Sequence, residues 1–237
     1  MKYIADLHTH TIASSHAYST ILENAGAARE RGICYLGMTD HGPMMEDAPH
    51  PWHFGNLGAI PGKLCGVKIL RGIEANILPG GGLDLDENLL RGLELVVASM
   101  HSPLHPAETK ERNTLDYCVA VQNPFVDVIG HSASEHFPYD YDIVLPVVKK
   151  HDKIIEIKGR FYSERVRDAY RRLALACMKY QVRIAVNSDA HFAYEIGDVQ
   201  DGLRLVEEIG YPKEWIVNCS CENMERYLAG RKERITG

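Results

Sequence analysis

Short apolar runs alternate with helical patterns along most of the chain. The runs are rich in Ile, Val and Leu, as is typical of strands buried on both faces, and they cover residues 3–10, 33–38, 68–77, 93–101, 126–131, 153–158 and 183–187. Thr20 and Glu23 have capping-box spacing, and Ser163 can cap a helix whose apolar face recurs about every 3.6 residues. Strands separated by helices predict a parallel sheet that is covered on both faces or closed into a barrel.

Polar side chains that can bind metals stand at the ends of these runs. His8 and His10 are two positions apart, so in a strand they project to the same face, and Asp189 and His191 repeat that spacing near the other end of the chain. In parallel α/β folds the chemistry collects at the carboxyl ends of the strands. The candidate ligands are His8, His10, His16, His41, Glu74, His101, His131, Asp189 and His191.

The types of donor indicate the kind of metal site. Imidazole nitrogens with a few carboxylate oxygens suit zinc, manganese or iron, whereas calcium and magnesium prefer oxygen almost exclusively. At three to four protein ligands per ion, nine donors suggest about three ions, and Glu74 is the candidate bridge between them. Any one of these histidines would more often be an ordinary surface or core residue, but their joint placement favours a metal centre.

Length and composition narrow the remaining possibilities. A chain of 237 residues, 45% of them hydrophobic, fits one α/β barrel, and we expect a single domain over residues 1–237. The formal net charge of -6 disfavours nucleic acid as a partner and leaves small anionic molecules as candidates. The sequence has neither a signal-peptide pattern nor a membrane-spanning run, which predicts a cytoplasmic protein without a membrane partner.

Some polar residues outside the ligand set have less certain roles. His50, Trp52 and His53 either form a lid or substrate wall or pack their own loop, and both alternatives stay open. Glu156, inside a strand, either orients a ligand imidazole or makes an ordinary ion pair. We expect three other histidines to lie at the surface: His105, His136 and His151.

Several short motifs coincide with the candidate ligands. They are D-L-H-T-H at residues 6–10, T-D-H-G at 39–42, G-I-E-A-N at 72–76, G-H at 130–131 and S-D-A-H at 188–191. In order and spacing they resemble the PHP (polymerase and histidinol phosphatase) family, and residues 15–20 and 45–54 resemble its small stand-alone members. The resemblance implies a distorted seven-stranded (β/α)7 barrel, a trinuclear and usually zinc centre, and phosphoesterase activity.

The resemblance also implies how the ligands divide among three ions. One ion would be held by His8, His10, Glu74 and Asp189, a second by Glu74, His101 and His131, and a third by His16, His41 and His191. All nine positions hold ligating residue types, which favours an active enzyme. The chain departs from the family pattern at Ser132-Ala133, where Pro-Gly is expected, and at Lys158, where an amide residue is expected. These departures leave the substrate specificity open.

The resulting prediction is a metal-dependent hydrolase, a phosphatase that acts on a small phosphate monoester. A metal-bound hydroxide would attack phosphorus in line, so no protein nucleophile is assigned, and the sequence identifies no general acid. The candidates for binding the substrate phosphate are Arg71, Lys158 and Arg160. The alternatives are a histidinol-phosphate phosphatase, a phosphodiesterase or nuclease of the same family, and a metal-binding module without turnover.

Overall fold

The computed structural model describes residues 2–102, 104–106 and 108–236. Its parallel strands follow the order β1-β2-β4-β5-β6-β7-β8, and the short β3 pairs antiparallel with β4. The strands are β1 Ala5–Asp6, β2 Tyr35–Met38, β3 Lys63–Leu64, β4 Val67–Asn76, β5 Leu95–Ser99, β6 Val128–Ile129, β7 Ile154–Lys158 and β8 Arg183–Asn187. Each apolar run predicted as a strand overlaps one of the parallel strands, with β4 beginning one residue before its predicted run, so this part of the prediction is confirmed.

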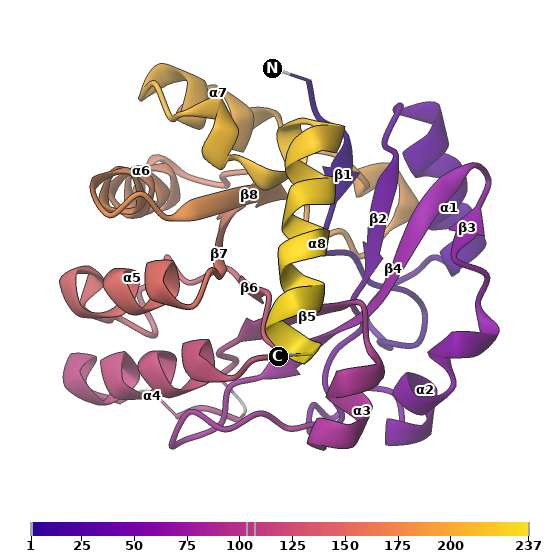
Figure 1. Ribbon diagram of the computed structural model, residues 1–237, viewed down its shortest axis with the longest axis horizontal. Coiled ribbons are helices and arrows are strands. Elements are labelled where there is room, and N and C mark those ends of the chain that lie inside the picture. The colour runs from indigo at the N-terminus through magenta and orange to yellow at the C-terminus, as the bar shows by residue number, and fades with distance from the viewer. Residues whose placement is uncertain (1, 103, 107, 237) are drawn as a thin grey trace.

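The first and last strands approach each other and nearly close the sheet into a barrel (Figure 1). Thr9 and Ala190 form a parallel bridge there, and the His10 amide donates to the Ala190 carbonyl at 2.8 Å. Asn218 also spans the gap, because its Nδ2 donates to a carbonyl of β1 at 2.9 Å and to a carbonyl of β8 at 2.6 Å. Closure of the barrel therefore brings the two ends of the chain together, and the predicted fold class is confirmed.

Helices cover the outside of the barrel, and α8 crosses one of its ends (Figure 1). They are α1 Ile21–Glu30, α2 Pro51–Gly55, α3 Glu87–Gly92, α4 Lys110–Gln122, α5 Tyr141–Lys150, α6 Glu164–Lys179, α7 Gln200–Glu208 and α8 Cys221–Thr236. Short 3-10 helices lie at Leu57–Ala59, Ala193–Glu195, Lys213–Trp215 and Val217–Cys219. The capping box of Thr20 and Glu23 and the Ser163 cap are both present. Within the described ranges, every helix is too short or too polar to cross a membrane.

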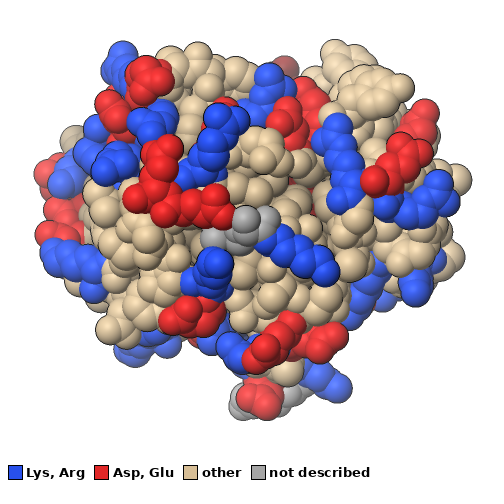
Figure 2. Space-filling model, turned by 90° about the horizontal axis from the view of Figure 1, so that it is seen from above, with Lys and Arg blue, Asp and Glu red and all other residues tan. Residues whose placement is uncertain are grey.

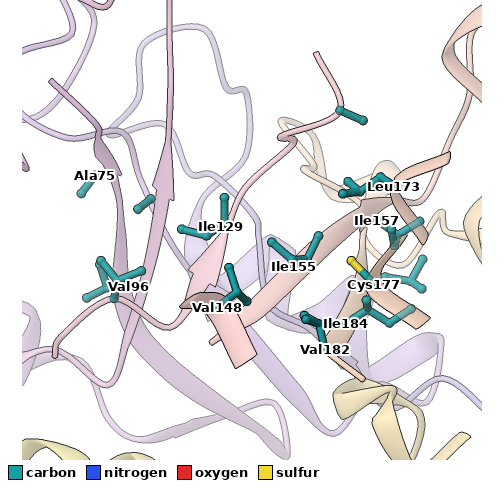
Figure 3. Packing of buried hydrophobic residues seen from close by; sticks show 14 of the residues in the cluster. Ala75, Val96, Ile129, Val148, Ile155, Ile157, Leu173, Cys177, Val182 and Ile184 are labelled. Carbon is teal, nitrogen blue, oxygen red and sulfur yellow. The ribbon is translucent and has the colours of Figure 1, made fainter. Parts of the chain in front are cut away.

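Two sets of buried apolar side chains form the core. The larger set fills the space between the sheet and the helices, where Val148, Ile155 and Cys177 lie (Figure 3). The smaller set fills the interior of the barrel and includes Leu70 of β4 and Tyr227 of α8. Because Tyr227 is 1% exposed, α8 acts as a plug for this interior.

The inward-facing positions change from apolar to polar along the strands. Ile154 of β7 and Ala185 of β8 belong to the interior apolar set, and the next inward positions are Glu156 and Asn187. Both of these polar side chains are fully buried. The apolar layer fixes the rotation of each strand, so it directs the polar layer toward one point at the carboxyl ends.

Candidate metal centre

The carboxyl ends of the strands bring the candidate ligands to one site, with Glu74 at its centre. Glu74, on β4, is fully buried. Its Oε1 lies 2.9 Å from His131 Nε2, 3.3 Å from His8 Nε2 and 3.4 Å from His101 Nε2. Histidines that follow three different strands therefore surround one carboxylate oxygen.

The other oxygen of Glu74 faces two further histidines. Oε2 lies 2.9 Å from His41 Nδ1 and 3.6 Å from His10 Nε2. Asp189 contacts the histidines of the first motif as well, because its Oδ1 lies 3.3 Å from His10 Nε2 and 3.4 Å from His8 Nε2. Glu74 and Asp189 therefore both face His8 and His10, as the closure of the barrel predicts.

His16 and His191 extend the cluster toward solvent. The ring centroid of His16 lies 4.9 Å from that of His41 and 4.5 Å from that of His191. The Nε2 atoms of His16 and His41 are 3.3 Å apart, and Asp47 contacts His16 Nδ1. The His16 side chain is 49% exposed, whereas that of His41 is 6% exposed. This part of the cluster is therefore its open side.

Several atoms of the candidate ligands are buried without a hydrogen-bond partner in the described part of the chain. They include His8 Nε2, His41 Nδ1, Glu74 Oε2 and His191 Nε2. Buried polar atoms are nearly always paired, so atoms that face one another without pairing require a further partner. Four overlapping sets of three donors have ligand atoms within 4.8 Å of one another, and the sets draw on His8, His10, His16, His41, Asp47, Glu74, His101 and His191. These nitrogen and oxygen donors fit divalent cations of the zinc, manganese or iron type.

The charges in the cluster also suit metal binding. Burial alone would raise the pKa of Glu74, but His8 and His101 beside it hold that pKa well below its usual value. Burial lowers the pKa of His10 to about 4, so this imidazole is neutral at pH 7. Burial opposes the protonation of His8, yet Glu156 and Glu74 raise the pKa of His8 well above its usual value. A cation that binds here would therefore displace a proton from His8.

Hydrogen bonds from neighbouring residues hold three of the ligand histidines. Glu156 Oε1 accepts from His8 Nδ1 at 2.9 Å, and Glu156 Oε2 accepts from the His131 amide at 2.7 Å. Asn76 Oδ1 accepts from His101 Nδ1 at 2.7 Å. Bonds to Nδ1 fix the tautomer of an imidazole and leave its Nε2 free to bind a metal. Of the two alternatives for Glu156, the geometry supports the orientation of His8.

Two of the residues in the site were not predicted from the sequence. Asn76 lies two positions after Glu74 on the same face of β4, and this spacing was a signal that could have identified it. Asp47 lies in the loop after β2, and no local pattern predicts that this loop returns to His16. Both residues act on the imidazole of a ligand rather than at a strand end of their own.

The backbone is unusual at two of the ligands. His131 and Asp189 have positive φ angles of 25° and 55°. Such angles are uncommon for residues other than glycine and cluster at functional sites. Gly130, just before His131, approaches β5 so closely that a Cβ there would lie 2.2 Å from Ser99 Oγ. The Gly-His motif therefore reflects close packing beside the ligand.

A cavity of about 610 Å³ opens beside the ligands, and Lys158 and Arg160 line it. Arg71, the third candidate for binding substrate, points elsewhere, because its Nε donates to Glu94 Oε2 at 2.7 Å. Arg71 lies three positions before Glu74 on β4, and an odd spacing puts two side chains on opposite faces of a strand. Arg71 is therefore no longer a candidate for binding substrate.

The histidine expected at the surface in the loop after β5 is in fact buried. His105 is fully buried, so that prediction is wrong. Its Nε2 lies 3.0 Å from Asp116 Oδ2 of α4, and its amide donates to the His101 carbonyl at 2.8 Å. The loop folds back over α4, which the residue's own sequence context could not reveal. His136 is exposed as predicted and lines the cavity, and His151 is half-buried.

The segment suggested as a lid or as loop packing contains one exposed and one packed side chain. Trp52 of α2 is 82% exposed. His53 lies next to it, and its Nε2 is 3.5 Å from Asp40 Oδ2, so this side chain packs against the buried residue that precedes His41. His53 therefore fits the loop-packing alternative.

The fold and the site define a class of protein: an α/β barrel enzyme whose strand ends carry histidine and carboxylate ligands for metal ions. The family model described as PHP domain matches residues 6–209, and the chain belongs to this family. A protein of Caldanaerobacter subterraneus subsp. tengcongensis named probable phosphatase is 41% identical over 242 residues, which cover 100% of this chain and 95% of the relative. A probable phosphatase of Acetivibrio thermocellus is 42% identical and covers 99% of each chain.

A solved structure has a similar fold. It is the histidinol phosphate phosphatase of Lactococcus lactis subsp. lactis complexed with zinc, L-histidinol and phosphate, and it matches with a TM-score of 0.63. The match covers 90% of this chain and 95% of that chain at 16% sequence identity, so it is a likeness of fold. The predicted family and the predicted class of enzyme, a metal-dependent hydrolase, are confirmed.

Proposed function

We propose that the chain hydrolyses a small phosphate monoester at a centre of three divalent ions, with zinc as the expected metal. The observation that carries the proposal is the gathering of histidine and carboxylate donors around Glu74, next to a cavity of about 610 Å³. A cavity of this size suits a small molecule. The names of the relatives, which are called probable phosphatases, and the zinc and phosphate in the Lactococcus structure support the same chemistry.

The proposed division of ligands follows the three groups expected from the family resemblance. The first ion takes His8, His10, Glu74 and Asp189, the second takes Glu74, His101 and His131, and the third takes His16, His41 and His191. Glu74 contacts histidines of all three groups, which supports its role as a bridge. Asp47 contacts His16 and would orient it for the third ion.

The proposed chemistry is divided between the ions and the chain. When bound, such ions lower the pKa of water toward about 7 and neutralise the charge of a phosphoryl group. Glu156 and Asn76 hold the ligand imidazoles in place. Lys158 lines the cavity with its Nζ 3.0 Å from Asp189 Oδ2, so it is placed to bind a phosphoryl oxygen beside the ligands. Arg160 also lines the cavity and is a candidate for binding another part of the substrate, and no protein nucleophile is proposed.

The alternatives receive less support from the structure. A nuclease would carry a basic stripe for the phosphate backbone, whereas Lys, Arg, Asp and Glu side chains intermingle on the face shown in Figure 2. A metal-binding module without turnover would not require an open cavity beside the ligands. A histidinol-phosphate phosphatase shares the fold, so the charge of the cavity must decide between that substrate and others.

The proposal is tested with protein purified without added metal and then loaded with zinc or manganese. We expect about three ions per chain by metal analysis and metal-dependent release of phosphate from an aryl phosphate monoester. His101→Ala should lower the ion count and abolish hydrolysis, because it removes a ligand close to Glu74. His151→Ala, at the end of α5 away from the ligands, is the matched control and should change neither quantity.

Three outcomes would contradict the proposal. Faster hydrolysis of a bis-aryl phosphate diester than of the monoester would indicate a phosphodiesterase. Full metal loading without hydrolysis of either ester would indicate a binding module. Unchanged activity of the His101→Ala variant would show that the ligand assignment is wrong.

A further inference from the structure

Cationic side chains line the cavity next to the candidate metal ligands. Lys158, Arg160 and Arg165 line it, and we call these three residues the cationic wall. Among the described residues that line the cavity, Glu135 is the acidic residue outside the ligand set, and it already accepts from Arg165 Nε at 2.9 Å. Outside the ligand set, the lining therefore places three cationic side chains against one carboxylate.

The ion pairs that the cationic wall makes are open to exchange with a ligand. Arg165 and Glu135 are 78% and 47% exposed, and Arg160 and Asp198 are 46% and 37% exposed with Nη1 and Oδ2 3.2 Å apart. Exposed pairs of this kind contribute little to stability, so an anion in the cavity can replace either carboxylate at small cost. The partner of Lys158 is Asp189, a candidate metal ligand whose charge a bound cation would offset.

An apolar surface adjoins the cationic wall. It consists of Ala133 from the loop after β6 and of Val166, Ala169 and Tyr170 from α6. Arg165 is in the first turn of the same helix, so apolar and cationic groups share one side of the cavity. A substrate whose phosphate faces the metal ligands would place its carbon skeleton against this surface and its far end against the wall.

We propose that the natural substrate is a small phosphate monoester whose leaving group carries a second anionic group, a carboxylate or a second phosphate, and that Arg160 and Arg165 recognise this group. The inference rests on the proposed phosphatase function. The expected substrate differs in charge from the ligand of the Lactococcus protein of similar fold, because L-histidinol carries an amine. A cationic wall repels an ammonium group and attracts an anion.

The test compares four substrates with the zinc-loaded enzyme. Glycerol 3-phosphate has a neutral leaving group, 3-phosphoglycerate adds a carboxylate, propane-1,3-diol bisphosphate adds a phosphate, and histidinol phosphate adds an ammonium group. We expect kcat/KM for at least one of the two anionic substrates to exceed that for glycerol 3-phosphate by about tenfold or more, the effect of one good charge pair. Histidinol phosphate should be the poorest substrate, and the better of the two anionic arms identifies the second group.

Two variants connect the preference with the wall. Arg165→Ala should lower the ratio of anionic to neutral kcat/KM about tenfold, mainly through KM for the anionic substrate. Arg167→Ala is the control, because Arg167 lies on the same helix but pairs with Glu208 and not with a residue of the cavity. Its ratio should match that of the unsubstituted enzyme.

The results that would overturn the inference are distinct from those that would overturn the phosphatase function. Equal kcat/KM for neutral and anionic substrates, a preference for histidinol phosphate, or a ratio unaffected by Arg165→Ala would reject the second anion while the enzyme still hydrolyses an aryl phosphate. Failure to hydrolyse any of these esters, the aryl phosphate included, would reject both proposals together.

Discussion

The side-chain amide of Asn76 lies between the carboxylate of Asp84 and the imidazole of His101. Its Nδ2 donates to Asp84 Oδ2 at 2.5 Å, and its Oδ1 accepts from His101 Nδ1 at 2.7 Å. Asp84 also accepts from the Met44 amide at 3.1 Å. A Cβ on Gly42 would lie 2.4 Å from the Asp84 carboxylate oxygens, so this contact requires glycine. Asp84 thereby determines which way the amide points and which nitrogen of His101 remains free.

We call the hydrogen-bonded series Asp84, Asn76 and His101 the relay. Exchanging the residue types at positions 76 and 84 should reveal it. Asp84→Asn and Asn76→Asp should each weaken the binding of one ion by about 10-fold to 100-fold, the usual effect of disturbing a residue that orients a ligand. Asn76→Asp alone would place two carboxylates against each other, because Asn76 Nδ2 now donates to Asp84. The double variant pairs a carboxylate at position 76 with an amide at position 84, so it removes this repulsion, keeps an acceptor for His101 and should recover part of the lost affinity. Zinc affinity is measured by competition with a chelating dye.

The relay prediction has a control in the same loop. Asp86→Asn alters an exposed cap of α3, where Oδ1 accepts from the Asn88 amide, and it should leave zinc affinity unchanged. Affinity losses that simply add in the double variant would show that residues 76 and 84 act independently.

Glu156 offers a second test of ligand orientation. Its Oε1 accepts from His8 Nδ1 and from Asn187 Nδ2, both at 2.9 Å, while its Oε2 accepts from the His131 amide. Glu156→Gln must present an NH₂ group to one of these donors, so we expect zinc affinity to fall about 10-fold to 100-fold. Glu225→Gln on α8 serves as the control. Equal zinc affinity of the Glu156 variant and the unsubstituted protein would show that Glu156 only fills space.

The buried contacts that hold α8 on the barrel should affect the free energy of unfolding but not metal binding. Asp127, fully buried before β6, accepts from Arg231 Nε and Arg234 Nη2, both at 2.7 Å, and from Tyr227 OH at 3.0 Å. Removing one partner of a buried ion pair costs about 3–5 kcal/mol, so Asp127→Asn should lower the free energy of unfolding by about that amount. Urea unfolding measures the change, and the zinc content of the folded variant should be normal.

A surface pair on the same helix provides the comparison. Arg226→Ala removes an exposed contact with Glu222 and should change the free energy of unfolding by less than about 1 kcal/mol. Similar losses for the Asp127 and Arg226 variants would contradict the role given to the buried pairs.

Lys153 should make stability depend on pH. The side chain is 1% exposed, and Nζ donates to the carbonyls of Asn123, Pro124 and Val126. Burial, with a smaller effect of repulsion by Arg234, lowers the pKa of Lys153 to about 7. The three carbonyls favour the charged form but do not outweigh these effects. An unfolded lysine has a pKa of about 10.4, so between these values the unfolded chain binds more protons and this residue's contribution to stability rises with pH.

The measurement is urea unfolding of the unsubstituted protein and of Lys153→Met at pH 7, 8, 9 and 10. The free energy of unfolding of the unsubstituted protein minus that of Lys153→Met should increase with pH, by at most about 5 kcal/mol between pH 7 and 10. Subtraction removes the contributions of other groups that titrate in both proteins. A constant difference would show that Lys153 keeps its ordinary pKa when folded, and a difference that shrinks with pH would show that folding raises this pKa; either result contradicts the prediction.

The strands of this protein and the grouping of most candidate ligands were predictable because the signals are local. A run such as residues 95–98, Leu-Val-Val-Ala, is apolar on both faces, and spacing by two puts His8 and His10 on one side of the chain. The same rule, applied to β4, would have placed Asn76 beside Glu74 and Arg71 on the other face. These assignments follow from backbone geometry alone.

Other features depend on where distant segments meet. The return of Asp47 to His16, the burial of His105 on Asp116 and the position of Asp84 next to Asn76 each join residues across loops. Loop paths depend on packing against elements far away in the sequence, so no local pattern specifies them.

The sequence by itself determined the parallel α/β architecture and the donor types at the strand ends, since burial periodicity and side-chain alternation are properties of each segment. The tertiary structure decided which residues orient those donors and which cations face the cavity. Side-chain alternation gives the face on which a residue lies, but the partner on that face depends on which segments the closed barrel brings together. Only the tertiary structure therefore places Lys158 in the cavity beside Asp189 and pairs Arg71 with Glu94.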